Sequence, residues 1–278
     1  MDLVNKQPSS ELVGVVKKFL IISDLNSMKT MYCLPDGGNF LFFNRGLNAC
    51  SSINAGEGFI IPKHFSASIK NNKAKKLTIY DDCETNSIPL PIILVELTPI
   101  GFYKLFKRDT YILNNAYLPI ESEINEKYFN NLYEHNEISE MINYLDNALV
   151  ALVQFNNVKP MLIEDIMYSI EHNHNYEVSI NTLMDEFNIT RKTMERQFKK
   201  IVGYTPKNYI YILKFLQSFL KYVEDMKTLK EMEYLYTDNA HFNVVFKNIT
   251  GYTPTQLFND VKNNKIQIYQ MRKKIENE

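Results

Sequence analysis

Short apolar runs separated by turn residues fill the first hundred positions of the chain. The turn residues include Asp36-Gly37-Gly38, Asn54-Ala55-Gly56 and Asn71-Asn72. The runs are rich in β-branched and aromatic residues and cover 39–44, 58–62, 66–70, 76–81 and 91–97. Runs of this kind at a spacing of about ten residues predict an antiparallel sandwich or barrel, filled by side chains or holding a small ligand. We expect a short helix over 12–22 to precede it.

From residue 101 onward the apolar positions change to helical spacing. Helices are predicted over 101–107, 123–135, 138–155 and 161–173. In the third helix one face carries an apolar stripe, formed by Ile138, Met141, Ile142, Leu145, Leu149, Leu152 and Val153. Such a stripe belongs either to the internal core or to a dimerisation surface, and the sequence leaves both interpretations open.

A nine-residue segment occurs twice in the C-terminal part of the chain. FKKIVGYTP at 198–206 returns as FKNITGYTP at 246–254, with seven of the nine positions identical. In each copy a glycine follows an apolar and basic helix, where a left-handed C-terminal cap is favourable. Thr-Pro then supplies an N-cap hydroxyl and a proline for the first turn of the next helix. The repeat therefore predicts two copies of a helix, tight turn, helix unit.

The segment before the first copy predicts a helix-turn-helix. Ile180, Leu183, Met184 and Phe187 form one apolar face, and 188–190 form the turn. Thr190 is expected to cap a second helix over 190–202, whose buried face holds Met194, Phe198 and Ile201 or Val202. Its exposed face carries Arg191, Lys192, Thr193, Glu195, Arg196, Lys199 and Lys200. Such side chains suit the major groove, because Arg and Lys donate to guanine and phosphate oxygens.

These two units resemble the C-terminal DNA-binding domain of AraC/XylS-type transcriptional regulators over about 176–260. Arg196, Phe198, Gly203, Pro206 and Tyr209 match the family pattern, while Thr190 replaces its usual Ser. In the second unit His241-Phe242 and Phe246-Lys247 match as well, which implies a second recognition helix over 238–249. The resemblance implies that a connecting helix, centred on 209–223, holds the two recognition helices about one DNA turn apart.

The second unit departs from the family pattern. The chain between Glu231 and His241 is about two residues short, and Glu233 occupies a position that is normally small and apolar. Alignment by the repeat places Val244 opposite Arg196, so most of the positive charge is lost. We therefore predict that the first helix supplies most of the DNA contacts. The predicted DNA-binding residues are Thr190, Arg191, Lys192, Thr193, Arg196, Lys199, Asn239, His241, Asn243 and Lys247.

Composition excludes several other classes of protein. The 278 residues include 31 Lys or Arg and 32 Asp or Glu, but residues 1–175 carry a net charge of −5 and residues 176–278 carry +4. No membrane span or signal peptide is apparent, and a cytoplasmic protein is expected.

Cys33, Cys50 and Cys83 form no CxxC pair, so reduced cysteines are expected. His64 is the only His before residue 135, which argues against a metal in the barrel. The pair His172 and His174 is interpreted as solvated linker residues rather than a zinc site.

The N-terminal segments 34–46 and 96–106 resemble cupin-like sensory domains attached to some of these regulators. The combined interpretation is an α+β protein, with an N-terminal antiparallel β-barrel or sandwich, a helical connector and an all-α C-terminal domain. The expected boundaries are 1–105 for the regulatory domain, 106–172 for the connector with a role in dimerisation, and 173–278 for the DNA-binding domain. We expect a sequence-specific transcriptional regulator and no enzyme, with double-stranded DNA as partner and no cofactor. A small-molecule effector, RNA polymerase as a further partner, and a monomer or homodimer stay open. The alternative is a protein-interaction module whose DNA-binding domain has degenerated.

Overall fold

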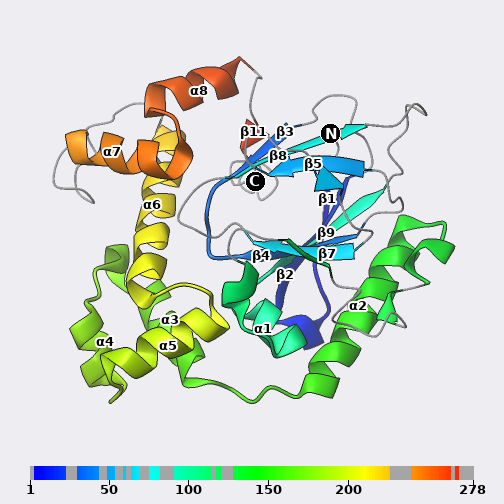
Figure 1. Cartoon of the computed structure of the whole chain (residues 1–278), viewed down its shortest axis with the longest axis horizontal. Helices are drawn as coiled ribbons and strands as arrows, with labels where there is room; N and C mark the ends of the chain where they lie inside the picture. The colour runs from blue at the N-terminus through cyan, green and yellow to red at the C-terminus, as the bar shows by residue number, and fades with distance from the viewer. Residues whose placement is uncertain are drawn as a thin grey trace.

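The computed structural model combines an N-terminal β-rich part with a helical C-terminal part (Figure 1). It describes residues 3–22, 30–43, 49–53, 59–60, 64–68, 75–81, 91–113, 117–119, 128–129, 131–225, 239–263 and 267–268. The fold is therefore a mixed α+β architecture, as the sequence predicts.

The larger sheet has six strands, all paired antiparallel, in the order β1-β2-β9-β4-β7-β10. These strands are β1 (Leu3–Lys6), β2 (Val16–Ile22), β4 (Asn39–Phe43), β7 (His64–Ser68), β9 (Ile92–Leu97) and β10 (Tyr117–Pro119). Strand β9 lies at the centre, where Val95 is opposite both Phe19 of β2 and Leu41 of β4. All six residues of β9 are buried, because the sheet is covered on both faces.

The second sheet has five strands in the order β11-β3-β8-β5-β6. They are β3 (Thr30–Cys33), β5 (Ala49–Ile53), β6 (Phe59–Ile60), β8 (Lys75–Asp81) and β11 (Gln267–Ile268). The strand β11 comes from the C-terminal end of the chain and pairs in parallel with β3, whereas the other pairs are antiparallel. Figure 1 shows the two sheets one above the other, with β11 at the edge nearest α8.

All five strand-like runs in the sequence correspond to strands, but the helix predicted over 12–22 is wrong. Only Ser10–Leu12 forms a short 3-10 helix, η1, and Val16–Ile22 is strand β2. Phe19, Leu20, Ile21 and Ile22 are all buried. Four consecutive buried residues indicate a strand packed on both faces, since a surface helix would expose part of such a run. Of the predicted turns, Gly37 has φ +81°, while residues 54–56 and 71–72 lie outside the described residues.

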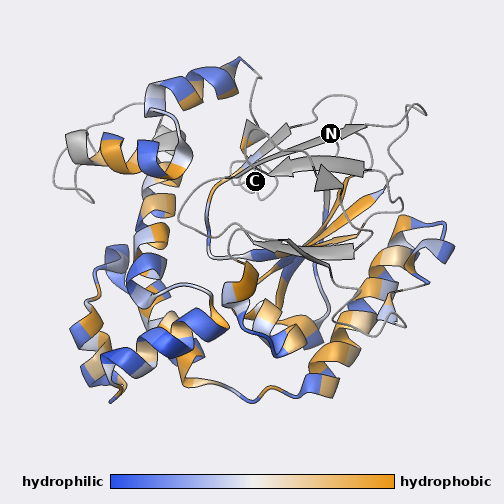
Figure 2. Ribbon diagram, viewed as in Figure 1, coloured by the Kyte–Doolittle hydropathy of each residue, from blue (hydrophilic) through white to orange (hydrophobic). Residues whose placement is uncertain are grey.

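Two helices cover the lower face of the six-stranded sheet. They are α1 (Gly101–Phe106) and α2 (Ile138–Asn156), and they pack against each other. The apolar stripe of α2 enters the same core as Phe19, Leu41 and Val95, through Met141, Ile142, Leu145, Leu149 and Leu152. Figure 2 shows the apolar residues of α2. The stripe therefore belongs mainly to the internal core, and Ile138 at its start is partly exposed.

The helix predicted over 123–135 is replaced in its described part by a short 3-10 helix, η4 (Leu132–Glu134). Phe129 and Leu132 are three positions apart and both buried, and a 3-10 turn places such residues on one side. Another short 3-10 helix, η2 (Thr110–Leu113), follows α1 and contacts the C-terminal part of the protein.

The C-terminal part is mainly helical in its described residues. Its helices are α3 (Leu162–Glu171), η5 (His174–Tyr176), α4 (Ile180–Glu186), α5 (Arg191–Ile201), α6 (Pro206–Asp225), α7 (Asn239–Thr250) and α8 (Pro254–Lys262). In Figure 1 the long helix α6 runs between a lower group, α3 to α5, and an upper group, α7 and α8. None of the described helices combines the length and the apolar character that a membrane-spanning helix needs.

Candidate nucleic-acid interface

The first helix-turn-helix consists of α4, a short turn and α5. The Ser179 side chain caps α4 by accepting a hydrogen bond from the Thr182 N–H, and Thr190 caps α5 by accepting one from the Thr193 N–H at 3.3 Å. In the turn, Asn188 adopts a left-handed conformation with φ +47°, which Asn tolerates better than most residues. The caps fix where α5 begins, as the sequence predicts.

One face of α5 is packed into the interior. Met194, Phe198 and Ile201 are buried, and Val202, just after the helix, is buried too. They share a core with Ile163 and Ile166 of α3, Leu183 of α4 and Ile212 of α6. Because α5 contacts α3, α4 and α6 through this face, its opposite face is fixed in orientation toward solvent.

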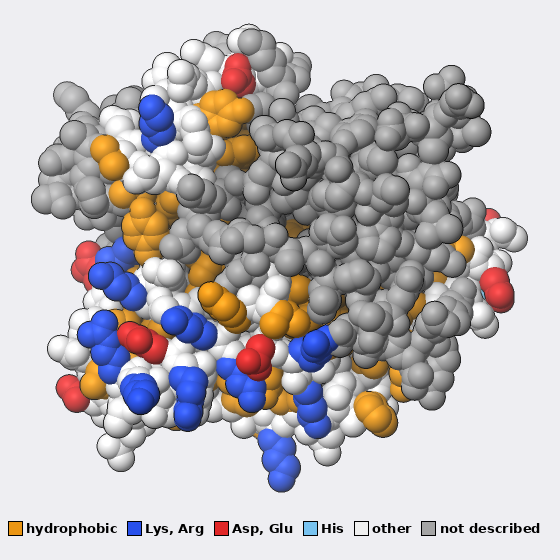
Figure 3. All heavy atoms as spheres, in the orientation of Figure 1, with side chains coloured by type: hydrophobic (Ala, Val, Ile, Leu, Met, Phe, Trp, Pro, Cys, Tyr) orange, Lys and Arg blue, Asp and Glu red, His pale blue; other side chains and the backbone are white. Residues whose placement is uncertain are grey.

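The solvent face of α5 is strongly basic. Its exposed cations are Arg191, Lys192, Arg196, Lys199 and Lys200. Figure 3 shows Lys and Arg side chains gathered along the lower part of the molecule, where Figure 1 places α4, α5 and α1. A helix with its apolar face buried and five cations exposed presents donors for phosphate and guanine oxygens.

Internal contacts occupy some of the predicted DNA-binding side chains. The Arg191 Nε lies 2.9 Å from Glu195 Oε1, one helical turn away. The Thr190 hydroxyl donates to the Thr193 hydroxyl within the cap. Lys200 extends over the Tyr103 ring of α1, with its Nζ 5.8 Å from the ring centre. Lys192, Arg196 and Lys199 are thus the cations of α5 that have neither an ion pair nor an aromatic ring as partner among the described residues.

The second unit has the same local geometry but less charge. Its recognition helix α7 begins at Asn239 and ends at Thr250, one residue later at each end than predicted. Phe242, Phe246 and Ile249 are buried as Phe198 and Ile201 are in α5. The described exposed residues of α7 include Asn243, Val244, Lys247 and Asn248. Asn239 and His241 lie in its first turn, and the first helix of this unit falls outside the described residues.

The repeat has the structure that its residues predict. Gly203 and Gly251 have φ of +86° and +77°, so each occupies the left-handed position after its helix. The Thr253 side chain accepts a hydrogen bond from the Gln256 N–H, and Asn208 N–H donates to Thr205 in the same way. Both Thr-Pro pairs therefore start the following helices, α6 and α8.

The helix α6 contributes to the cores of both units. Ile210 and Ile212 pack with α5, whereas Phe215 and Phe219 pack with Phe246 of α7. One rigid element thus sets the spacing and the relative orientation of α5 and α7.

Residues of the β-rich part complete both cores, and no pattern in the sequence predicts these contacts. Ile100 belongs to the core around α5, and Thr110 donates a hydrogen bond to the Ile201 carbonyl at the end of α5. Tyr32 and Leu34 pack with α6 and α7, and the Tyr32 hydroxyl donates to the Thr250 carbonyl. Contacts between residues more than 200 positions apart leave no local pattern that sequence reasoning could use.

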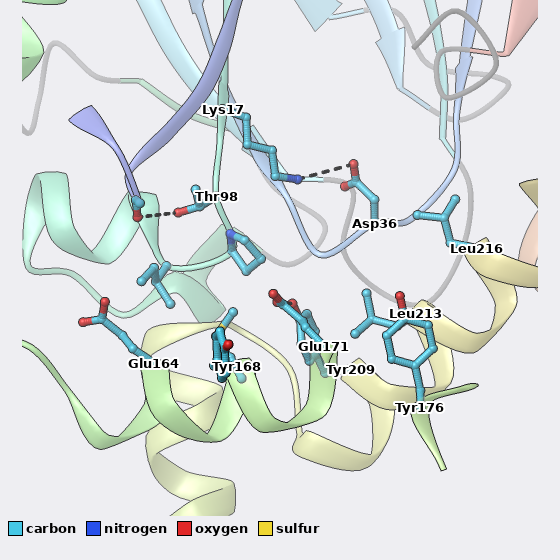
Figure 4. A pocket seen from close by; sticks show the side chains of 14 residues that line it. Lys17, Asp36, Thr98, Glu164, Tyr168, Glu171, Tyr176, Tyr209, Leu213 and Leu216 are labelled. Atoms are coloured by element: carbon cyan, nitrogen blue, oxygen red, sulfur yellow. Dashed lines mark hydrogen bonds and ion pairs between the residues drawn. The ribbon is translucent and has the colours of Figure 1, made fainter. Parts of the chain in front are cut away.

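A pocket lies between the β-rich part and helices α3 and α6 (Figure 4). Its volume is about 510 Å³. Lys17 and Asp36 line one side, and Glu171, Tyr176 and Tyr209 line the other. Tyr209 is buried and its hydroxyl donates to Glu171; burial, and then the neighbouring carboxylate of Glu171, raise the pKa of this tyrosine well above its usual value.

The described histidines and cysteine lie outside any cluster of metal-binding side chains. In the described part of the chain, no three His, Cys, Asp or Glu side chains form a group that could hold a metal ion. His172 is exposed and stacks on Tyr168 with ring centres 3.8 Å apart, and His174 is exposed. Cys33 is buried and forms no disulfide among the described residues.

A family model matches the C-terminal part of the chain, and relatives match part of its length. The model of a helix-turn-helix domain family matches residues 183–260. The HTH-type transcriptional activator RhaS of Enterobacter sp. (strain 638) is 25% identical over 113 residues, which is 40% of each chain. RhaS of Pectobacterium carotovorum subsp. carotovorum (strain PC1) is 23% identical over 97 residues, 34% of this chain and 35% of the relative. The match thus spans at most about two fifths of the length of these relatives.

Two solved structures of ToxT from Vibrio cholerae strain SCE256 are distantly similar. The apo form of a ToxT variant covers 91% of this chain and 98% of its own, with 11% identity and a TM-score of 0.45. ToxT with a bound unsaturated fatty acid covers 86% and 94%, with 10% identity and a TM-score of 0.42. Similarity at this level carries no conclusion about the present chain.

The repeat, the capped turn, the buried and basic faces of α5 and the match over 183–260 all agree. The C-terminal part of this chain is a helix-turn-helix domain of the AraC/XylS type.

Proposed function

We propose that this protein is a sequence-specific DNA-binding transcriptional regulator, and that it reads DNA mainly through α5. The observation that carries the proposal is the basic face of α5, which is held toward solvent by the buried Met194, Phe198 and Ile201. Lys192, Arg196 and Lys199 would contact DNA without first breaking an ion pair. Arg191 would contact DNA after its ion pair with Glu195 is broken. Thr190 and Thr193 would support the helix N-terminus, which attracts phosphate through its free N–H groups.

The second unit would add weaker contacts. Among the described exposed residues of α7, Lys247 is the cation that corresponds to the basic residues of α5. Asn243 is a polar residue on the same exposed surface. Asn239 and His241, in the first turn of α7, remain predicted contacts. The helix α6 has 20 residues and is therefore about 30 Å long, close to the roughly 34 Å that separates successive major-groove faces. This length supports simultaneous binding by both units.

The β-rich part would have a regulatory role. We infer the division 1–105, 106–172 and 173–278, with a cupin-like sensory domain first and a connector next. Its support is the direct packing of Tyr32, Leu34 and Ile100 on the DNA-binding units, which gives the first domain a route to affect them. The burial of the α2 stripe removes most of the surface that a dimer of that helix would use.

The experiment is a selection of bound fragments from genomic DNA with the purified full-length protein. Arg191→Ala combined with Arg196→Ala is the test variant, and Lys159→Ala, which removes an exposed cation outside the helix-turn-helix, is the control. We expect a recurring motif with the wild type and the control, and loss of that motif in the double variant. Fragments enriched without any motif, or no enrichment, would instead favour the protein-interaction module.

The unequal roles of the two units are tested with single variants on the selected motif. We expect Arg196→Ala to reduce the affinity for DNA more than Lys247→Ala does, and binding to weaken steeply as salt rises. Equal losses in the two variants would show that both units contribute alike.

A further inference from the structure

The pocket between the β-rich part and the helices has walls from segments distant in sequence. Lys17 comes from β2 and Asp36 from the loop before β4, whereas Glu171 ends α3 and Tyr209 belongs to α6. A cavity of about 510 Å³ is in the size range of small-molecule sites. A molecule held there would touch the regulatory part and the DNA-binding part at once.

The charged groups that line the pocket are mainly acidic. Among the described lining residues there are three carboxylates, Asp36, Glu164 and Glu171, and one ammonium, that of Lys17. The Lys17 Nζ lies 3.4 Å from Glu96 and 3.9 Å from Asp36, so carboxylates already hold it. An anionic ligand would have to compete with these carboxylates for the single lining cation, which makes the pocket unfavourable for an anion.

Glu171 is the lining carboxylate best placed to meet a ligand, although Lys17 is near enough to interact with it electrostatically. Glu171 points into the cavity in Figure 4 and is exposed, and within the described part of the chain no Lys, Arg or His lies within ion-pair distance of it. It is also the last residue of α3, where the free carbonyl groups of a helix end add negative potential. The Tyr209 hydroxyl donates to its Oε1 and leaves Oε2 for another donor.

Aromatic rings complete the same region. Tyr168, Tyr176 and Tyr209 line the pocket near Glu171. Tyr209 is buried and the Tyr168 ring is stacked on His172, so Tyr176 is the ring best placed to meet a ligand. Tyr176 is half-buried and has a left-handed backbone with φ +53°. The faces of aromatic rings attract cations, and a carboxylate beside tyrosine rings is a recurring way to hold an organic ammonium group.

We propose that this pocket binds a small organic cation, an alkylammonium or quaternary ammonium compound, with its charge beside Glu171 and against the Tyr176 ring. The role of this cation as an effector rests on the proposed function, whereas its binding does not. The apolar lining, which includes Pro99, Leu213 and Leu216, would hold the hydrocarbon part of the ligand.

Calorimetric titration of the full-length protein tests this inference with matched probes. Choline is the cation, 3,3-dimethylbutan-1-ol is its uncharged analogue of nearly the same shape, and octanoate is the anion. We expect choline to bind at least about tenfold more tightly than either of the others, since the neutral analogue lacks the charge that Glu171 and the Tyr176 ring recognise. Equal binding of choline and its neutral analogue, preference for octanoate, or no binding of choline would overturn the inference.

Two substitutions in the pocket test which residues hold the cation. Glu171→Gln removes the charge but keeps an acceptor for Tyr209, and Tyr176→Leu removes a ring but keeps a bulky apolar side chain. The control is Glu177→Gln, which removes an exposed carboxylate from the next loop and outside the pocket lining. We expect choline affinity to fall about tenfold or more in the first two variants and to stay unchanged in the control. Unchanged affinity in both pocket variants, each verified as folded by its melting temperature, would place the cation elsewhere and refute the site.

The DNA measurements separate this inference from the proposed function. A protein that selects a DNA motif but binds no choline would leave the proposed regulator intact and overturn the cation site. A protein that binds choline at Glu171 but selects no motif would support the cation site and count against the regulator.

Discussion

Glu195 gives the sharpest test of how α5 approaches DNA, because its carboxylate holds Arg191 in the free protein. The Arg191 Nε and Glu195 Oε1 are 2.9 Å apart, and both side chains are substantially exposed. Replacing Glu195 by Gln removes this ion pair and also removes a negative charge from the surface that would face phosphates. We therefore expect Glu195→Gln to bind DNA more tightly than the wild type.

The size of the effect follows from two contributions. An exposed ion pair one helical turn apart contributes about 0.3–0.5 kcal/mol. This pair is absent from Glu195→Gln, so DNA binding by the variant does not have to break it. A carboxylate about 7 Å from a phosphate in a water-like environment adds repulsion of about 0.6 kcal/mol. Together they predict an affinity about fivefold higher. If Arg191 then neutralises one more phosphate, the slope of log affinity against log salt should become steeper by about 0.9.

Fluorescence anisotropy with the selected motif at several salt concentrations measures both quantities, with Glu177→Gln as the control for loss of a distant carboxylate. The reasoning would be refuted by weaker binding of Glu195→Gln together with lost preference for cytosine at one position. That result would mean that Glu195 accepts a hydrogen bond from a cytosine amino group, which is the other role a carboxylate has in the major groove.

Three further predictions concern stability. Phe198→Ala should lower the free energy of unfolding by about 3–5 kcal/mol, measured by urea denaturation, because Phe198 is fully buried beneath α5. Gly101→Ala should lower the melting temperature markedly, since a Cβ there would overlap the carbonyl oxygen of Val15, whereas Gly14→Ala would meet no neighbouring atom and should show only the strain of its positive φ. Burial, and then a nearby carboxylate, raise the pKa of Tyr209 in the folded protein above its value in the unfolded chain, about 10. The free energy of unfolding should therefore fall as the pH rises above about 10, and Tyr209→Phe should reduce this loss.

The sequence was sufficient for features that depend on neighbouring residues. The turn before α5, the caps at Thr190 and Thr253 and the buried positions of α5 all follow from patterns within a few residues, and each is confirmed. Strand β4 could be recognised for the same reason, because aromatic residues cluster between turn residues.

Features that depend on distant residues could not be predicted in this way. Residues 16–22 have a composition that a helix also tolerates, and pairing with β1 and with β9, which lies 70 or more positions away, makes them a strand. The pocket is formed by Lys17, Asp36 and Glu171, which approach one another only through the packing of α3 and α6 on the β-rich part. No local pattern marks such a site.

The pairing of β11 with β3 has a consequence for how the protein is made. Because a ribosome releases the chain from its N-terminus, β3 is an open edge of its sheet until residues 267–268 have emerged. Among the described strands, β11 is the one that covers this edge, so the nascent protein carries an unpaired strand edge until residue 268 has been synthesised. Ribosome stalling or premature termination shortly before residue 267 would leave this edge free to pair with other chains, so truncated products should be prone to aggregation.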